Sequence, residues 1–107
     1  MKGGMSSMSC YFVAQIRIDK PDEYNKYLEG VDEVFSKFKG KYLAVDTNPL
    51  VLEGEWAYSR VVMIEFPNEE EFRRWYESPE YQAIVTHRLK GAKCDTLLVG
   101  RGGPSQD

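Results

Sequence analysis

The chain has 107 residues and a formal net charge of −3, with 42% hydrophobic and 29% charged residues. These values are typical of one globular domain with a single hydrophobic core. No apolar run approaches the roughly 18–20 residues that a membrane-spanning helix requires. The acidic balance argues against a nucleic-acid-binding protein, which usually presents a basic surface to the phosphates.

The two ends of the chain differ in composition from its middle. Residues 1–8 and 101–107 are rich in Gly, Ser and Pro, which predicts flexible tails around one domain at 9–100. The first residues lack the apolar stretch of a secretory signal, so we expect a cytoplasmic protein. Met1, Met5 and Met8 all remain possible translation starts.

The first two predicted elements are a strand and a helix. Alternation from Cys10 to Asp19 predicts a strand with one fully apolar face. Pro21 suits the first turn of a helix, which we expect to end at Gly40. The apolar positions of this helix recur at steps of three and four, as expected for a face turned to a core. They are Tyr24, Tyr27, Leu28, Val31, Val34, Phe35 and Phe38.

Two further strands are predicted in the middle of the chain. Lys41–Asp46 forms the second strand, and Leu50–Glu53 is expected to extend it after a turn that contains Pro49. Arg60–Phe66 forms the third, with Val62, Ile64 and Phe66 facing the core.

The second half of the chain predicts a helix in two pieces. Asn68 and Glu71 form a capping pair that opens the first piece. Ser78 and Pro79 then cap and restart the helix. A last strand is expected over Lys93–Val99.

The predicted element order is β-α-β-β-α-β. This order is the split βαβ pattern of the ferredoxin-like α+β fold, an antiparallel sheet with its helices on one face. We expect the strand order 4-1-3-2, with the second helix split at Ser78-Pro79. The opposite face of this sheet would lie open.

The open face is predicted to be too apolar for a solvated surface. A second copy packed sheet to sheet across a two-fold axis would cover it, whereas a monomer with an amphipathic face remains the alternative. The expected dimer face consists of Tyr11, Val13, Gln15, Arg17, Val61, Met63 and Glu65.

Several segments together resemble one bacterial family, number thirteen-thirty of the domains of unknown function. They are the Tyr24/Tyr27 spacing, Gly40–Leu43, Val51–Trp56, Val61–Pro67 and Ser78–Gln82. The resemblance implies a homodimeric α+β barrel of the kind built by small cofactor-free monooxygenases and muconolactone-isomerase-like proteins. The family has no agreed reaction, so the resemblance implies no catalytic residue.

Metal and disulfide chemistry have little support in the sequence. His87 is the one histidine, whereas zinc sites favour several His or Cys at short spacing, and we expect neither a metal nor another cofactor. Cys10 and Cys94 each begin a strand, and these strands are predicted to be antiparallel neighbours. The two thiols would therefore lie at opposite ends and stay reduced.

Four core-directed tyrosines indicate a possible site, because a buried hydroxyl left without a partner costs about 1–3 kcal/mol. Their rings could fill the core with the hydroxyls at its rim, or they could line a ligand cleft between helices and sheet. Arg88 could anchor a carboxylate or enolate there, with Tyr81 or His87 moving a proton. The candidate cleft residues are Tyr24, Tyr27, Tyr42, Glu53, Trp56, Tyr81 and Arg88.

The sequence therefore favours a homodimer that binds a small, aromatic or polyketide-like molecule. By fold-level analogy such a protein could be a cofactor-free monooxygenase or isomerase. A non-catalytic ligand carrier or protein-interaction dimer is the alternative. The pocket could be the helix–sheet cleft or the lumen of the dimeric barrel.

Overall fold

The computed structural model describes residues 9–101, and the predicted tails at 1–8 and 102–107 lie outside this range. Arg101, which was assigned to the C-terminal tail, donates from Nε to Glu69 Oε1 at 3.0 Å. The elements in chain order are β1 (Cys10–Ile18), α1 (Pro21–Phe35), β2 (Lys41–Asp46), β3 (Arg60–Phe66), α2 (Glu69–Tyr76), α3 (Pro79–Gly91) and β4 (Ala92–Val99).

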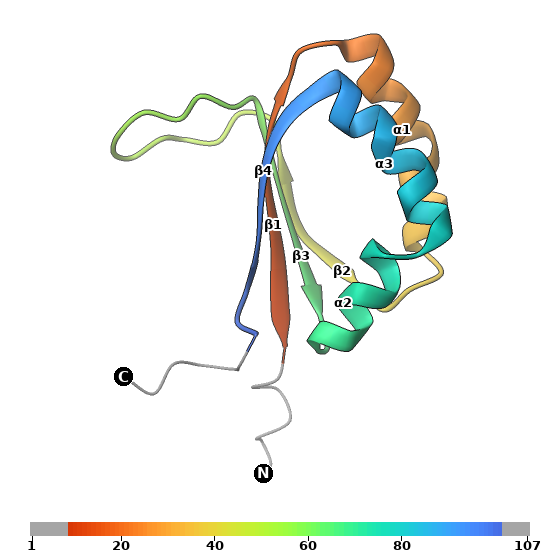
Figure 1. Ribbon diagram of the computed structural model, residues 1–107. Helices are drawn as coiled ribbons and strands as arrows, with labels where there is room; N and C mark the ends of the chain where they lie inside the picture. The colour runs from red at the N-terminus through yellow and green to blue at the C-terminus, as the bar shows by residue number, and fades with distance from the viewer. Residues whose placement is uncertain (1–8, 102–107) are drawn as a thin grey trace.

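The four strands form one antiparallel sheet in the order β2-β3-β1-β4, as the sequence predicts. All three helices cover the same face, and the other face is open (Figure 1). The architecture is the ferredoxin-like α+β fold. Its two layers follow from the sequence, because β1 alternates between buried residues and partly or fully exposed ones over most of its length.

Both predicted helix caps in the second half are confirmed. Asn68 Oδ1 accepts the Glu71 backbone N–H at 2.9 Å, and Ser78 Oγ accepts that of Tyr81 at 3.1 Å. Each cap satisfies a backbone donor that the first turn of a helix leaves free. The break between α2 and α3 allows both helices to turn their aromatic residues to one core.

Trp75 of α2 is the centre of that core and is 1% exposed. Its ring lies 5.5 Å from Phe66 in a stacked arrangement and 4.3 Å from Tyr81 in a tilted one. Further ring contacts reach Phe12 of β1 and Phe35 of α1. One side chain therefore connects the sheet to all three helices, and such aromatic pairs contribute beyond their buried area.

The predicted end of the first helix was wrong. α1 ends at Phe35, and the next residues form tight turns in which Lys37 and Phe38 donate to Val34 and Phe35. Phe38 still packs against the core from this turn. The apolar spacing of the sequence persisted beyond the helix because a tighter turn also returns every third residue to the same side.

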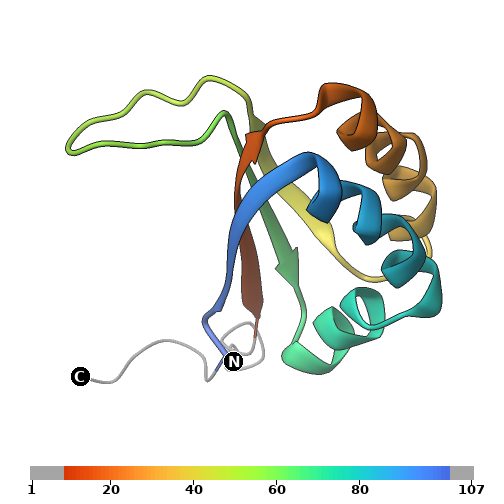
Figure 2. The ribbon, with the colours of Figure 1, turned by 45° about the horizontal axis from the view of Figure 1, so that its top comes forward.

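The predicted strand at Leu50–Glu53 was also wrong. Pairing of β2 with β3 stops at Asp46 and Val61, and residues 47–59 form a long loop without a strand. The loop projects away from the sheet on the side opposite the helices (Figure 2). Leu50 and Leu52 are each 84% exposed on it, so their apolar character does not come from a place in the sheet.

Gly40 sits in a space that admits no side chain. A Cβ at this position would lie 2.6 Å from the Phe35 ring and 2.7 Å from the Phe66 ring. We expect Gly40→Ala to lower the free energy of unfolding by about 1–3 kcal/mol, because an overpacked core must shift. Urea denaturation measures this, with Gly30→Ala in α1 as the control. An equal loss in both variants would contradict the packing argument.

Candidate ligand-binding site

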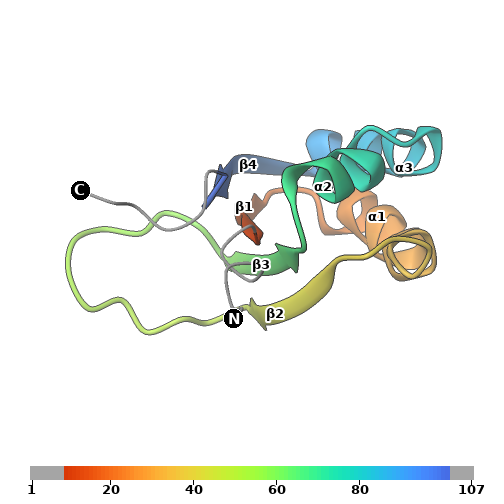
Figure 3. The same ribbon diagram turned by 90° about the horizontal axis from the view of Figure 1, so that it is seen from below.

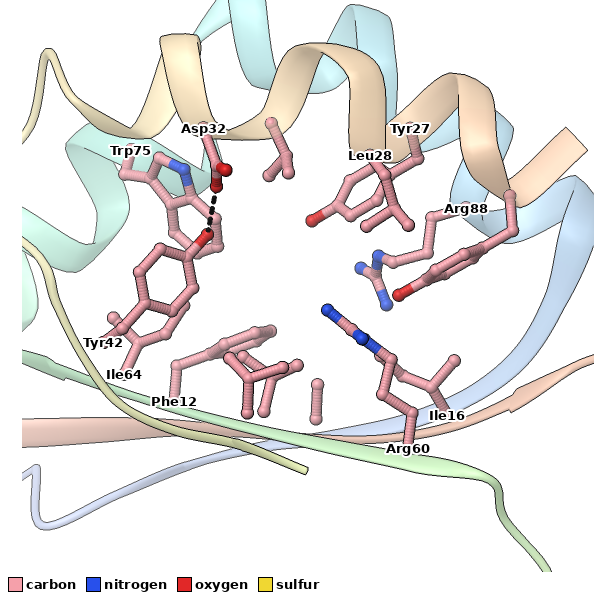
Figure 4. A pocket seen from close by; sticks show the side chains of 15 residues that line it. Phe12, Ile16, Tyr27, Leu28, Asp32, Tyr42, Arg60, Ile64, Trp75 and Arg88 are labelled. Atoms are coloured by element: carbon pink, nitrogen blue, oxygen red, sulfur yellow. Dashed lines mark hydrogen bonds between the residues drawn. The ribbon is translucent and has the colours of Figure 1, made fainter. Parts of the chain in front are cut away.

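A cavity of about 550 Å³ lies between α1 and the sheet. The sheet side is lined by Phe12, Ala14 and Ile16 of β1 with Val62 and Ile64 of β3 (Figure 4). Ala14, in the middle of this floor, has a short side chain between two large ones. The layers therefore leave space here that a larger residue would fill.

The cavity opens at the edge of the fold between α1 and β2. Its lining residues there, Leu28, Tyr42 and Val45, are each partly exposed, whereas Ala14 and Ile64 on the floor are buried. A solute can therefore enter from this edge. The opening is distinct from the open face of the sheet, which lies on the other side of the strands (Figure 3).

Arg88 of α3 reaches into the cavity and is only 3% exposed. Within residues 9–101, its Nε and Nη1 atoms have no hydrogen-bond partner. Its guanidinium carbon lies 5.7 Å from the centre of the Tyr27 ring, a cation–π distance. An aromatic face offsets only part of the cost of removing this charge from water.

Arg60, the first residue of β3, points into the same end of the cavity. Its Nε is also buried without a partner in the described part of the chain. The guanidinium groups of Arg60 and Arg88 face one another (Figure 4). Neither arginine forms an ion pair with any carboxylate of residues 9–101.

The opposite end of the cavity carries its one acidic lining residue, Asp32 of α1. Asp32 Oδ1 accepts the Tyr42 hydroxyl at 3.3 Å. Burial and the neighbouring Asp32 raise the pKa of Tyr42 well above its usual range. The cavity is thus polarised, with two cations at one end and a carboxylate at the other (Figure 4).

Two buried tyrosines satisfy one another beside the arginines. The hydroxyl oxygens of Tyr27 and Tyr81 lie 2.8 Å apart. Burial is the main cause that raises the pKa of both phenols, and the Arg88 charge partly opposes this for Tyr81. Both hydroxyls therefore stay protonated at neutral pH, an arrangement that suits hydrogen-bond donation rather than proton abstraction.

His87 lies outside the cavity lining. Its Nδ1 is 2.6 Å from Glu23 Oε2, so it joins α3 to α1. The hydrogen bond with His87 is the main cause that lowers the pKa of Glu23. This contact accounts for the position of His87 between the helices.

The structure brings together some of the predicted cleft residues and separates others. Tyr24, Tyr27, Tyr42 and Arg88 line the cavity, and Tyr81 bonds to Tyr27 behind it. Glu53 and Trp56 do not line it, because they belong to the 47–59 loop.

Trp56 instead packs on the other side of the sheet. Its Nε1 donates to Oε1 of Gln15, a residue of the open face, at 3.0 Å.

Sequence reasoning missed Arg60, although the alternation contained the signal. Val62, Ile64 and Phe66 were assigned to the core face of β3, and Arg60 shares their parity. An arginine at an inward position of a strand is uncommon, and it marks a charged group directed at a core.

The residues of the predicted dimer face do share one face of the sheet. Opposite one another in the ladder are Tyr11 and Glu65, Val13 and Met63, and Gln15 and Val61. β4 adds two exposed apolar residues that were not predicted, since Leu97 pairs with Val13 and Val99 with Tyr11. Leu97 is 57% exposed, so this face is more apolar than the sequence indicated.

The model of a domain of unknown function, DUF1330, matches residues 9–101. The chain belongs to the DUF1330 family. This confirms the resemblance found in the sequence. A search of curated proteins finds no match to the chain.

Solved structures share this DUF1330 fold at low sequence identity. A protein of unknown function from Rhodopseudomonas palustris has a TM-score of 0.69 at 20% identity, over 94% of this chain and 85% of that one. SnoaB from Streptomyces nogalater, described as a cofactor-independent oxygenase, has a TM-score of 0.62 at 17% identity, over 92% and 95%. A dimeric ferredoxin-like protein of unknown function from Thermobifida fusca gives 0.62 at 15% identity, over 91% and 94%.

Three other features of the DUF1330 chain concern its cysteines, metal binding and membrane-spanning helices. Cys10 and Cys94 are free thiols, and Cys94 pairs with Ile16, far along β1 from Cys10. Among residues 9–101, no cluster of three His, Cys, Asp or Glu side chains could hold a metal ion. No helix of that range is long and apolar enough to cross a membrane.

The buried phenols predict how the protein responds to alkali. A free tyrosine ionises near pH 10, so Tyr27 and Tyr81 contribute stability that is complete below that pH. Because their pKa values are raised in the folded state, this stability is lost as pH rises above about 10. We expect their phenolate absorbance to appear only together with loss of circular dichroism. Ionisation of every tyrosine in a folded protein would contradict this.

Proposed function

We propose that this DUF1330 protein is a homodimer that binds a small anionic molecule with a flat apolar body in the helix–sheet cavity. The observation that carries the proposal is Arg88, a buried cation whose Nε and Nη1 atoms have no partner within residues 9–101. Buried charges in proteins are paired or bind a ligand, because an unpaired one is costly. A carboxylate or enolate oxygen is the natural partner for a guanidinium.

The rest of the cavity suits an apolar, planar molecule. Phe12, Trp75, Tyr27 and Tyr42 contribute ring surfaces to its lining, and aliphatic side chains contribute most of the remainder. The volume is within the range that holds small molecules. A cationic end in an otherwise mostly apolar pocket suits an aromatic acid or a polyketide-like enolate.

A catalytic form of this proposal is isomerisation or cofactor-free oxidation. Both begin when the substrate loses a proton to give an enolate, whose negative oxygen Arg88 would stabilise. In the oxidation, dioxygen would place one atom in the product and release the other as water, with the substrate losing two hydrogens. SnoaB, described as a cofactor-independent oxygenase, supports this form by fold alone.

A carrier without catalysis is the second candidate, and the positions of the acid–base groups favour it. Asp32 is the one carboxylate of the lining, and it lies at the end opposite the arginines (Figure 4). The tyrosines beside Arg88 have raised pKa values and are poor bases. Binding therefore has more structural support than proton transfer.

The homodimer part of the proposal is supported by the open sheet face. Exposed Met63, Leu97 and Val99 lie there, and a second copy would remove them from water. The 47–59 loop extends on the same side with its two exposed leucines and can reach over a partner (Figure 1). A ferredoxin-like protein of similar fold is described as dimeric.

The homodimer is tested by one charge on this face. We expect light scattering to give about twice the chain mass of 12.3 kDa for the native protein. Val13→Glu should give the single-chain mass, because an unpaired carboxylate would be buried in the interface. Leu89→Glu, at an exposed apolar position of α3, is the matched control and should stay dimeric. A native protein of single-chain mass at micromolar concentration would refute the dimer.

Ligand binding is tested with 2-naphthoate as an aromatic monocarboxylate. We expect calorimetry to detect binding and Arg88→Met to weaken it about tenfold or more, since a charge-assisted hydrogen bond is lost. Lys90→Met removes an exposed cation two positions along α3 and should leave the affinity unchanged. Equal weakening in both variants would indicate general electrostatic attraction rather than a site.

A further inference from the structure

We propose that the ligand presents two negatively charged groups side by side, and that Arg60 and Arg88 together bind this pair of groups. This inference rests on the proposed function and specifies its ligand class. It follows from the pair, since Nε of Arg60 and both Nε and Nη1 of Arg88 are buried without a partner in the described chain. The two groups come from different elements, β3 and α3, and converge at one end of the cavity (Figure 4).

Two cations that share one low-dielectric space repel one another. Residues 9–101 offer no carboxylate that pairs with either arginine, so both charges stay uncompensated by the described part of the chain. A ligand with one negative charge would leave one guanidinium unpaired. A ligand with two adjacent negative groups would neutralise both and use their planar donors in bidentate hydrogen bonds.

The far end of the cavity determines the orientation of such a ligand. Asp32 repels an anion there and already accepts a hydrogen bond from Tyr42. The charged head must therefore lie at the arginines, with the apolar body along Phe12 and toward Trp75 (Figure 4). The ligand class is a flat aromatic molecule with two vicinal acidic groups at one edge, such as an aromatic ortho-dicarboxylate.

Two matched probes distinguish binding of a dianion from binding of a monoanion. Naphthalene-2,3-dicarboxylate and 2-naphthoate share one ring system and differ by one carboxylate. At mildly alkaline pH and low salt, we expect the dicarboxylate to bind the native protein at least about tenfold more tightly. In Arg60→Met this preference should disappear, while 2-naphthoate should still bind through Arg88.

Arg74→Met is the control variant, because Arg74 is an exposed cation of α2 that does not line the cavity. It should keep the full preference for the dicarboxylate.

Thermal unfolding gives a second readout that does not need a ligand. Arg60→Met removes one of two like charges that face each other and so relieves their repulsion. Without ligand, this variant should therefore unfold at or above the temperature of the native protein. The dicarboxylate should raise the midpoint of the native protein more than that of Arg60→Met. A merely structural Arg60 would instead give a variant of lower midpoint.

The outcomes separate this inference from the proposed function. Equal affinity of both probes for the native protein would overturn the dianion and leave the anionic site intact. A preference for the dicarboxylate that persists in Arg60→Met would also overturn it, because a residue other than Arg60 would then bind the second carboxylate. If neither probe binds, the proposed function fails together with the inference.

Discussion

The packing of Trp75 is the constraint on which the rest of the structure depends. Its ring contacts the sheet through Phe12 and Phe66, and α1 and α3 through Phe35 and Tyr81. This cluster holds the helical layer against the sheet at one end. Toward the other end the same layers enclose the cavity, and Trp75 itself forms part of its wall. A closely packed aromatic end and a hollow end with two arginines thus belong to one core.

The hollow end lowers the stability of the folded protein. A fold gains most when its core is filled and its buried charges are paired, yet here a cavity contains two arginines without counter-charges from residues 9–101. Proteins retain such costs mainly at sites where a ligand offsets them. The tyrosine pair beside Arg88 fits this view, because the Tyr27 and Tyr81 hydroxyls bond to one another while Nε and Nη1 of Arg88 have no partner within residues 9–101.

The two sides of the sheet have different roles in this account. The helix side encloses the cavity, and the open side carries the exposed apolar residues Met63, Leu97 and Val99. The 47–59 loop extends from the sheet away from the helices (Figure 3). The loop of the open side and the lining of the cavity are joined at Ser59 and Arg60. The Ser59 backbone N–H donates to Ile16 O at 2.8 Å, and Arg60 is the next residue in the chain. The loop that extends from the open face therefore ends at a residue of the cavity.

Much of the fold was predictable because local signals and burial agree. Alternation in β1, the caps at Asn68 and Ser78, and the inward tyrosines each follow from short-range chemistry, and the strand order follows from the element order. The predicted strand at Leu50–Glu53 was wrong, because an apolar segment that pairs with no strand can have the same composition as one that does. Glu53 and Trp56 belong to the same loop and do not line the cavity, and Trp56 bonds to Gln15 of the open face.

The sequence by itself determined the class of fold, the family and the faces of its strands, because periodicity and capping depend on neighbours along the chain. Only the tertiary structure decided that Arg60 and Arg88 meet, that Tyr27 pairs with Tyr81, and that Asp32 stands at the opposite end. Those relations join residues from separate elements. The distances between these residues depend on the spacing between the helices and the sheet, which the packing around Trp75 sets. No local sequence pattern contains that spacing.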